Sequence, residues 1–291
     1  QTARRLQSEK RVALAISCRL FGISRQAIYQ RQKYQQAKQV ALEPVASMVM
    51  DIRRMMPRLG TRKLYYLLKP KLESQAIKLG RDGLFAYLRQ RYMLVKPKRS
   101  YTKTTDSRHW MKKHPNIMKD FIVKAPEQAF VSDITYVETD EGVHYLSLVT
   151  DAWSRKIMGY ELSSEMKAQD IVKALKKAIS NREYDSELLH HSDRGSQYCS
   201  ALYQQELNKH GIQPSMTDGY DCYQNALAER VNGILKQEFL LHRCKTIEEL
   251  KDLVSESISI YNGMRPHLSL GFRTPESVHR QTKASCETQL A

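Results

Sequence analysis

The chain has 291 residues, enough for one large domain and one or two small ones. Lysine and arginine total 47 against 31 acidic residues, and the net charge of +16 favours a polyanionic partner, with nucleic acid ahead of an anionic membrane surface. No segment approaches the roughly 18 apolar residues of a membrane-spanning helix. The five cysteines are scattered without a C-x-x-C pair, which predicts reduced thiols in a cytosolic protein and excludes a cysteine zinc site.

The front of the chain predicts a helix-turn-helix within residues 1–40. Apolar residues at Val12, Leu14, Ala15, Cys18 and Leu20 fit one helix face. Gly22 supplies a turn and Ser24 is a good N-cap for a second helix. In this arrangement the second helix enters the DNA major groove, against the alternative of an ordinary helical hairpin. The predicted DNA contacts on that helix are Arg25, Gln26, Gln30 and Arg31.

A second helical DNA-binding unit is predicted for residues 41–95, with helices in RKLYYLLKPKL and DGLFAYLRQRY. Arg62 and Lys63, at the start of the first of these helices, are its predicted DNA contacts. Residues 96–124 have many lysines and little apolar periodicity, so they predict an extended basic linker. Lys96, Lys98 and Arg99 are then candidates for contact with a phosphate backbone, although a purely solvated linker is an open alternative.

From residue 125 onward the pattern becomes mixed α/β. Three strand candidates, FVSDITYVE, HYLSLVTD and KIMGYEL, are followed by alternating helices and strands that end in the helical run NALAERVNGILKQEFLL. Three antiparallel strands, then helix, strand, helix, strand and helix, is the element order of a ribonuclease-H-like fold. We therefore predict a mixed five-stranded sheet with helices and a C-terminal helical extension over residues 125–291.

Three acidic residues stand where this fold would bring them together. Asp133 lies in the first strand, Asp193 ends the fourth, and Glu229 follows 35 residues later on the last long helix. Carboxylate oxygens suit Mg²⁺, and two such ions roughly 4 Å apart can activate a nucleophile and stabilise a leaving oxygen at a phosphodiester. An isolated acidic residue is usually a surface charge, so the prediction depends on the set of three.

Several stretches carry a family resemblance. FVSDITYV, YLSLVTDAWSRKIMGY, LLHHSDRGSQYCS, NALAERVNGILKQEF and YNGMRPHLSLGFRTPES resemble, in order and spacing, the integrase core of bacterial insertion-sequence-three transposases, which are relatives of retroviral integrases. The resemblance covers residues 125–280 and, more weakly, the helical front.

This resemblance implies an active site and a reaction. Asp133, Asp193 and Glu229 match the family's catalytic and metal-binding triad, which holds two Mg²⁺ or Mn²⁺ ions, cuts the 3′ ends of the element and joins them to DNA. Lys236 matches a position that faces DNA, and Asn225 matches an asparagine one turn before the glutamate; both are predicted DNA contacts. Arg265 lies in the closing motif, where contact with phosphate and packing of the last helix are both open.

The chain departs from the family pattern at one position beside the glutamate. Gln224 stands where the family commonly has Asp, although the triad itself is intact. Asp151, at the end of the second strand candidate, is interpreted as a turn acceptor, and His190 and His191 as packing residues.

The resulting prediction is a bacterial, cytoplasmic and nucleoid-associated transposase that binds double-stranded DNA. Two element ends must be cut and joined together, so we expect a homo-oligomer, at least a dimer. Two alternatives stay open: a ribonuclease-H-like nuclease or resolvase without strand transfer, and a DNA-binding regulator that does not catalyse.

Overall fold

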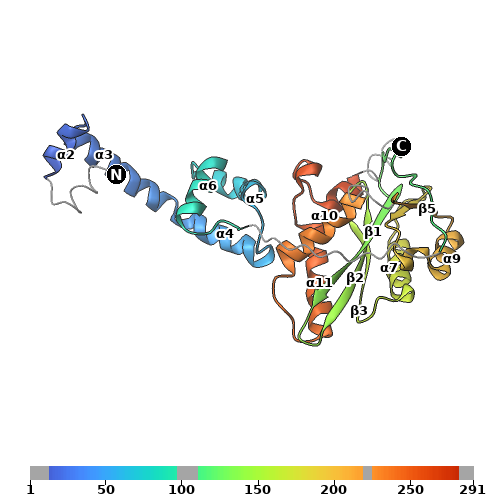
Figure 1. The fold of residues 1–291 in the computed structure, drawn as a ribbon. Helices are drawn as coiled ribbons and strands as arrows, with labels where there is room; N and C mark the ends of the chain where they lie inside the picture. The colour runs from blue at the N-terminus through green and yellow to red at the C-terminus, as the bar shows by residue number, and fades with distance from the viewer. Residues whose placement is uncertain (1–12, 97–110, 219–224, 282–291) are drawn as a thin grey trace.

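A computed structural model describes residues 13–96, 111–218 and 225–281. At the front, α2 (Leu14–Leu20) and α3 (Arg25–Ala41) form an arm that leads away from the rest of the chain (Figure 1). Gly22 makes the turn at a φ of 63°, and the Ser24 hydroxyl accepts the backbone N–H of Ala27 at 3.1 Å, as expected for an N-cap.

The arm differs from the predicted helix pair in its packing. On α2 the side chain of Cys18 is buried, but Leu20 is 73% exposed, and α3 has no buried residue along its 17 residues. Two helices alone offer little apolar surface to cover each other, so Ala15 and Leu20 of the predicted apolar face stay exposed, while Val12 lies outside the described residues.

The second helical unit has a core of its own. It consists of α4 (Glu43–Met55), α5 (Thr61–Ser74) and α6 (Arg81–Gln90), of which α5 and α6 correspond to the two helices that the sequence predicts. Its helices pack through fully buried aliphatic side chains, namely Val45, Val49, Leu64, Leu68, Leu84 and Leu88. These residues recur at three- and four-residue spacing, which places them on one face of each helix.

The remainder is built on a five-stranded mixed sheet in the order β3-β2-β1-β4-β5. Strands β1 (Ala129–Glu138), β2 (Val143–Asp151) and β3 (Ile157–Ser163) are antiparallel, whereas β4 (Leu189–Ser192) runs parallel to β1 and β5 (Gln213–Met216) runs parallel to β4. The predicted ribonuclease-H-like sheet is therefore confirmed, with β1 at its centre.

Helices cover both faces of the sheet (Figure 1). Helices α7 (Ala168–Ser180), α8 (Ser196–Cys199) and α9 (Ala201–Lys209) share a buried cluster with Phe130 and Val149 of the sheet. The opposite face carries α10 (Ala226–Ile234), the π-helical turn η2 (Leu235–Phe239) and α11 (Ile247–Gly263), followed by the short turn η3 (Leu268–Leu270).

Over the ranges that the structure covers, the helices are too short or too polar to cross a lipid bilayer. The thiols of Cys18, Cys199 and Cys244 are free, while Cys222 and Cys286 lie outside the described residues.

Candidate active site

Strand pairing brings the two aspartates together. Strands β1 and β4 run parallel with Val131 opposite His191. Continuing this register by two residues places Asp133, in the middle of β1, beside Asp193, which directly follows the carboxyl end of β4. Because side chains alternate along a strand, Asp133 points to the same face as Val131. Val131 packs with Ala228 of α10, so this is the sheet face that α10 covers.

Two asparagines fasten α10 to β1 on either side of Glu229. The Asn225 amide donates to the backbone oxygen of Ser132 at 3.0 Å, and the Asn232 amide donates to Asp133 Oδ2 at 2.8 Å. These asparagines lie four residues before and three after Glu229, which puts them on one helix face with it. The helix therefore presents Glu229 toward the two aspartates.

The carboxylates influence one another electrostatically. Burial raises the pKa of Asp133 to about 7, and the negative charges of Asp193 and Glu229 raise it further. The hydrogen bond from Asn232 acts in the opposite direction and lowers this pKa. The pKa of Glu229 is also raised, by burial and by Asp193. Carboxyl groups whose pKa values are raised by burial and by neighbouring carboxylates form a site in which a divalent cation would relieve the repulsion.

The donor set fits a hard cation. Among the described residues, no three His, Cys, Asp or Glu side chains already stand close enough to hold one ion, so the triad would have to converge on the metal. The buried Oδ1 atoms of Asn225 and Asn232 and the hydroxyl of Tyr198 have no hydrogen-bond partner within the described part of the chain. Acceptor oxygens and carboxylates suit the hydrated ions that Mg²⁺ forms in proteins.

The two histidines before Asp193 are part of the core. His190 Nε2 lies 2.8 Å from both Ser132 Oγ and Tyr203 Oη, and burial lowers its pKa to about 3. His191 Nδ1 lies 2.9 Å from Ser215 Oγ. Both rings are buried and engaged, which agrees with the interpretation of these residues as packing residues.

Asp151 is a structural acceptor in the β2–β3 hairpin. Its carboxylate accepts the backbone N–H of Glu127 at 2.8 Å and of Ser154 at 2.7 Å, and it is fully buried. The interpretation of Asp151 as a turn acceptor agrees with these contacts.

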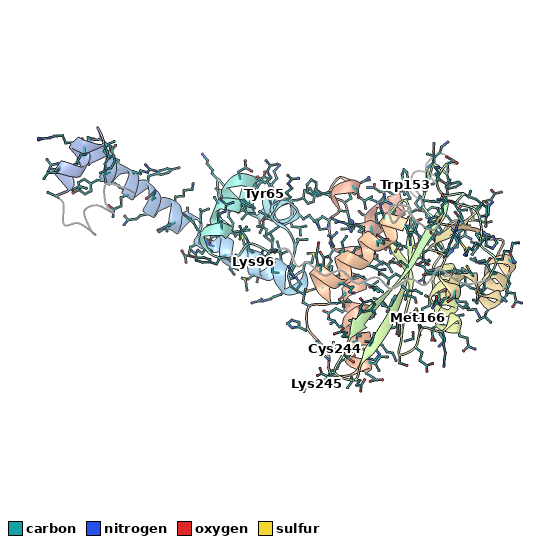
Figure 2. The ribbon with its side chains drawn as sticks, viewed as in Figure 1. Tyr65, Lys96, Trp153, Met166, Cys244 and Lys245 are labelled. Atoms are coloured by element: carbon teal, nitrogen blue, oxygen red, sulfur yellow. The ribbon has the colours of Figure 1, made fainter. Side chains whose placement is uncertain are left out.

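Most predicted DNA contacts lie on the surface of the helical front. Arg62 and Lys96 are exposed on the second unit, where Figure 2 shows Lys96, and Lys98 and Arg99 lie outside the described residues. The predicted recognition residues on α3 are all exposed, namely Arg25, Gln26, Gln30 and Arg31.

Four predicted DNA contacts belong to the interior or to its rim, and the first is Asn225, whose buried amide donates to the backbone of Ser132. Arg265 is 1% exposed, its Nε and Nη2 donate to Glu238, and its Nη1 lies 2.9 Å from His267 Nε2, which favours the packing alternative for this residue. Lys63 Nζ lies 3.4 Å from the same glutamate. Lys236 Nζ donates to Thr135 Oγ1 at 3.3 Å and lies 4.5 Å from the centre of the Tyr136 ring, beside β1 and beyond Glu229 along the helix.

Sequence reasoning missed the roles of Asn232 and Glu238. A polar residue three positions after Glu229, on the face that covers the sheet, was the available signal for Asn232. For Glu238 no local signal exists, because its partners Lys63 and Arg265 are distant in the chain.

Family models and sequence relatives of known proteins match most of this chain. Two family models of the integrase core domain match residues 123–222 and 210–275. An uncharacterised 31 kDa protein of insertion element IS600 from Shigella sonnei is 33% identical over 263 residues, which are 89% of this chain and 95% of that protein. Transposase InsF for insertion sequence IS3A from Escherichia coli (strain K12) is 34% identical over 221 residues, covering 75% of this chain and 76% of the transposase.

Solved structures give a weaker likeness. The catalytic core domain of HTLV-2 integrase in complex with magnesium matches 53% of this chain and 97% of its own at 18% identity, with a TM-score of 0.43. A simian T-cell lymphotropic virus intasome matches 76% of this chain and 74% of its own at 16% identity, with a TM-score of 0.47. The family of this chain is therefore established by its sequence relatives and by the family models. With an integrase core over its second half and relatives of this extent, the chain belongs to the insertion-sequence-three family of transposases.

Proposed function

We propose that this transposase uses Asp133, Asp193 and Glu229 to cut the ends of its element and to join them to DNA. The observation that carries the proposal is the arrangement of β1, β4 and α10, which directs three electrostatically coupled carboxylates to one place. Carboxylates in such a group bind phosphodiesters only through cations, since their own charges would repel a phosphate.

The cofactor in this proposal is a pair of Mg²⁺ ions, which Mn²⁺ can replace. When bound, these ions supply activation of the attacking oxygen and stabilisation of the leaving oxygen. Asp133 and Asp193 would hold them from adjacent strands and Glu229 from the helix above. Asn232 would fix the orientation of Asp133 through its 2.8 Å hydrogen bond.

Two displacements at phosphorus make up the reaction. In the first, water attacks the phosphate at the element end, the bond from phosphorus to the 3′ oxygen breaks, and a free 3′-OH results. In the second, that 3′-OH attacks a target phosphodiester, a new bond to phosphorus forms, and the target's own 3′ oxygen leaves. Neither step needs an oxidant or a reductant.

DNA recognition in this proposal belongs to the helical front. Helix α3 would enter the major groove of the terminal inverted repeat with Arg25, Gln26, Gln30 and Arg31, and Arg62 of the second unit and Lys96 would contact the backbone. Lys236, beside β1, would face the DNA at the active site. We expect the protein to act as at least a dimer on paired ends, in the bacterial cytoplasm at the nucleoid.

The test is a cleavage and joining assay on DNA that carries element ends, with and without Mg²⁺, for the wild type, Glu229→Gln and Asp193→Asn. We expect joined products from the wild type only, and a loss in both variants of about a thousandfold or more, with DNA affinity nearly unchanged. Cleavage without joining in the wild type would indicate a nuclease, and tight binding without either reaction would indicate a regulator. Full activity of Asp193→Asn would remove that residue from the site.

A further inference from the structure

The helix that carries Glu229 is held at three points. Asn225 and Asn232 fasten it to β1, and Glu238 in η2 fastens its far end. Helix α10 and η2 are continuous, so Glu238 lies roughly 13 Å along the same helical rod from Glu229. The first two attachments lie within the sheet domain, but the third reaches the second helical unit.

Glu238 is the centre of a buried ionic cluster. Arg265 Nε and Nη2 donate to its two carboxylate oxygens at 2.8 and 2.7 Å, and Lys63 Nζ of α5 lies 3.4 Å from Oε1. The side chains of Arg265, Lys63 and Glu238 are 1%, 13% and 18% exposed, respectively. A bidentate pair with this burial fixes the position of the carboxylate far better than a surface ion pair would.

The pKa shifts of Glu238 and Lys63 agree with an ion pair between them. Burial favours the neutral form of Glu238, but hydrogen bonds and charges from Arg265 and Lys63 outweigh it and lower its pKa. The pKa of Lys63 is lowered to about 8, by burial first and then by the charge of Arg265. Lys63 is therefore mostly charged at neutral pH and contributes a real ion pair across the contact.

The local helix geometry sets the direction of Glu238. Residues Leu235–Phe239 form a π-helical turn, in which each residue turns through a smaller angle about the axis than in an α-helix, and Glu238 lies within this turn. A regular α-helical continuation would direct Glu238 elsewhere on the rod. Single π turns often occur at functional sites, and this one follows directly on the helix that carries Glu229.

A second contact holds α5 against the sheet domain. The ring of Tyr66 stacks on Phe272 with centroids 4.9 Å apart and planes 13° from parallel. Buried residues of the helical unit, such as Leu64, belong to the same continuous hydrophobic cluster as Val231 and Ile234 of α10. The unit and the helix that carries Glu229 thus share both an apolar and an ionic interface.

We infer that Glu238 is a positioning residue that couples docking of the second helical unit to the placement of Glu229. The unit that is proposed to bind the element end supplies Lys63, and Lys63 stabilises the end of the helix through Glu238. Binding of DNA to that unit would therefore affect the position of Glu229 in the active site. The inference rests on the proposed function for its effect on rate, but its structural part can be tested separately.

The main experiment compares Lys63→Met with Lys63→Arg and with a control, Lys69→Met. Lys69 is on the same helix, 58% exposed and paired with its helix neighbour Glu73. We expect Lys63→Met to lower the single-turnover joining rate at saturating DNA by about fivefold to tenfold, while Lys63→Arg and Lys69→Met stay close to wild type. A role limited to DNA binding would instead raise the dissociation constant and leave the saturated rate unchanged.

Glu238→Gln and the double variant Lys63→Met with Glu238→Gln complete a cycle. If Lys63 acts through Glu238, the double variant is no slower than Glu238→Gln alone. Hydrogen exchange supplies a readout that needs neither DNA nor metal: amides of residues 226–239 should exchange faster in Lys63→Met than in Lys69→Met.

The outcomes distinguish a failure of the proposed coupling from a failure of the proposed function. Unchanged exchange in residues 226–239 together with an unchanged joining rate in Lys63→Met would overturn the coupling, and so would rate losses that multiply in the double variant. If the wild type gives no joined products, the proposed function fails, and the exchange experiment alone then decides whether docking of the helical unit stabilises the helix.

Discussion

At the scale of single residues, the site depends on neighbours that hold the acids in place. Asn232 donates to Asp133, and Asn225 secures the start of the same helix on the backbone of β1. Both amides are almost fully buried, so each hydrogen bond forms away from competing water. The carboxylate orientation is therefore a property of the helix-to-strand contact as much as of the acids themselves.

Replacing Asn232 with Ala should lower the rate of strand joining by about tenfold to a hundredfold, and it should raise the Mg²⁺ concentration needed for half-maximal rate. The reason is that Asp133 loses the contact that orients it. The measurement is a Mg²⁺ titration of the joining rate. Asn208→Ala, at an exposed position near the end of α9, is the control and should match wild type. An unaltered Mg²⁺ dependence in Asn232→Ala would contradict an orienting role.

At the scale of elements, the sheet and α7 are in contact at a glycine. A Cβ atom at Gly159 of β3 would lie 2.2 Å from the backbone oxygen of Ala174 and 2.5 Å from the backbone nitrogen of Ala178. Both neighbours are main-chain atoms of α7 and cannot rotate away. Absence of a side chain at this position therefore determines how closely the helix approaches the sheet.

Gly159→Ala should lower the free energy of unfolding by about 1–3 kcal/mol because the helix must shift outward. Urea denaturation measures this change. Gly233→Ala is the matched control, since no atom lies within 4 Å of its Cβ position, and alanine in a helix is expected to be neutral or stabilising. Equal stability of Gly159→Ala and wild type would show that the contact is looser than the distances indicate.

A second element-level feature is the anchor of the last described helix, residues 275–281. Its fully buried His279 lies 3.1 Å from Glu127 and 3.8 Å from Asp151. Burial alone would lower the pKa of His279, but hydrogen bonds to Asp151 and Glu127 raise it. Burial would raise the pKa of Glu127, but hydrogen bonds from His279 and from the backbone of Glu183 and Tyr184 lower it.

These opposite shifts predict a pH window for the anchor. With its pKa raised, His279 stabilises the fold fully below its ordinary value of 6.5, and this contribution is lost as pH rises through the folded pKa. With its pKa lowered, Glu127 stabilises the fold above its ordinary value of 4.5 and loses the contribution as pH falls through the folded pKa. Raising the pH from about 6 to about 9 should therefore lower the thermal unfolding midpoint of wild type more than that of His279→Gln. Parallel pH profiles of the two proteins would refute this anchor.

At the scale of the whole molecule, the charge is distributed to suit a long polyanion. The net charge of +16 accompanies an exposed helical arm that extends away from the sheet domain (Figure 1). Figure 2 shows side chains along the arm and the second unit projecting into solvent. Such a shape lets one chain contact DNA at points well separated from the reacting groups.

DNA affinity should accordingly fall steeply with salt. Each phosphate contact adds about 0.9 to the slope of log affinity against log salt, so Arg62→Ala and Lys96→Ala, which remove proposed backbone contacts, should each reduce the slope by about 1. Affinity measured at several salt concentrations provides the slope. Lys251→Ala, on the exposed face of α11, serves as the control and should retain the wild-type value. A slope that neither substitution changes would show that these two residues do not contact the phosphate backbone.

The sequence by itself determined most element types of the sheet domain and pointed to the candidate site. Alternation in FVSDITYVE is confirmed as β1, and the spacing of Asp133, Asp193 and Glu229 pointed to one constellation because side-chain periodicity and chain order are local properties. Ser24 as an N-cap is likewise a local property and is confirmed. These local patterns do not specify which residues far apart in the chain come into contact.

Only the tertiary structure determined those long-range contacts. The π turn that directs Glu238, the burial of Arg265 and the pairing of Lys63 with that glutamate join segments far apart in the chain. Sequence reasoning therefore left Arg265 open between DNA and packing and assigned Lys63 to DNA, because a basic side chain looks the same whether its partner is a phosphate or a buried carboxylate. The physical reason is that charge is encoded residue by residue, whereas burial and ion pairing exist only after separated elements have packed together.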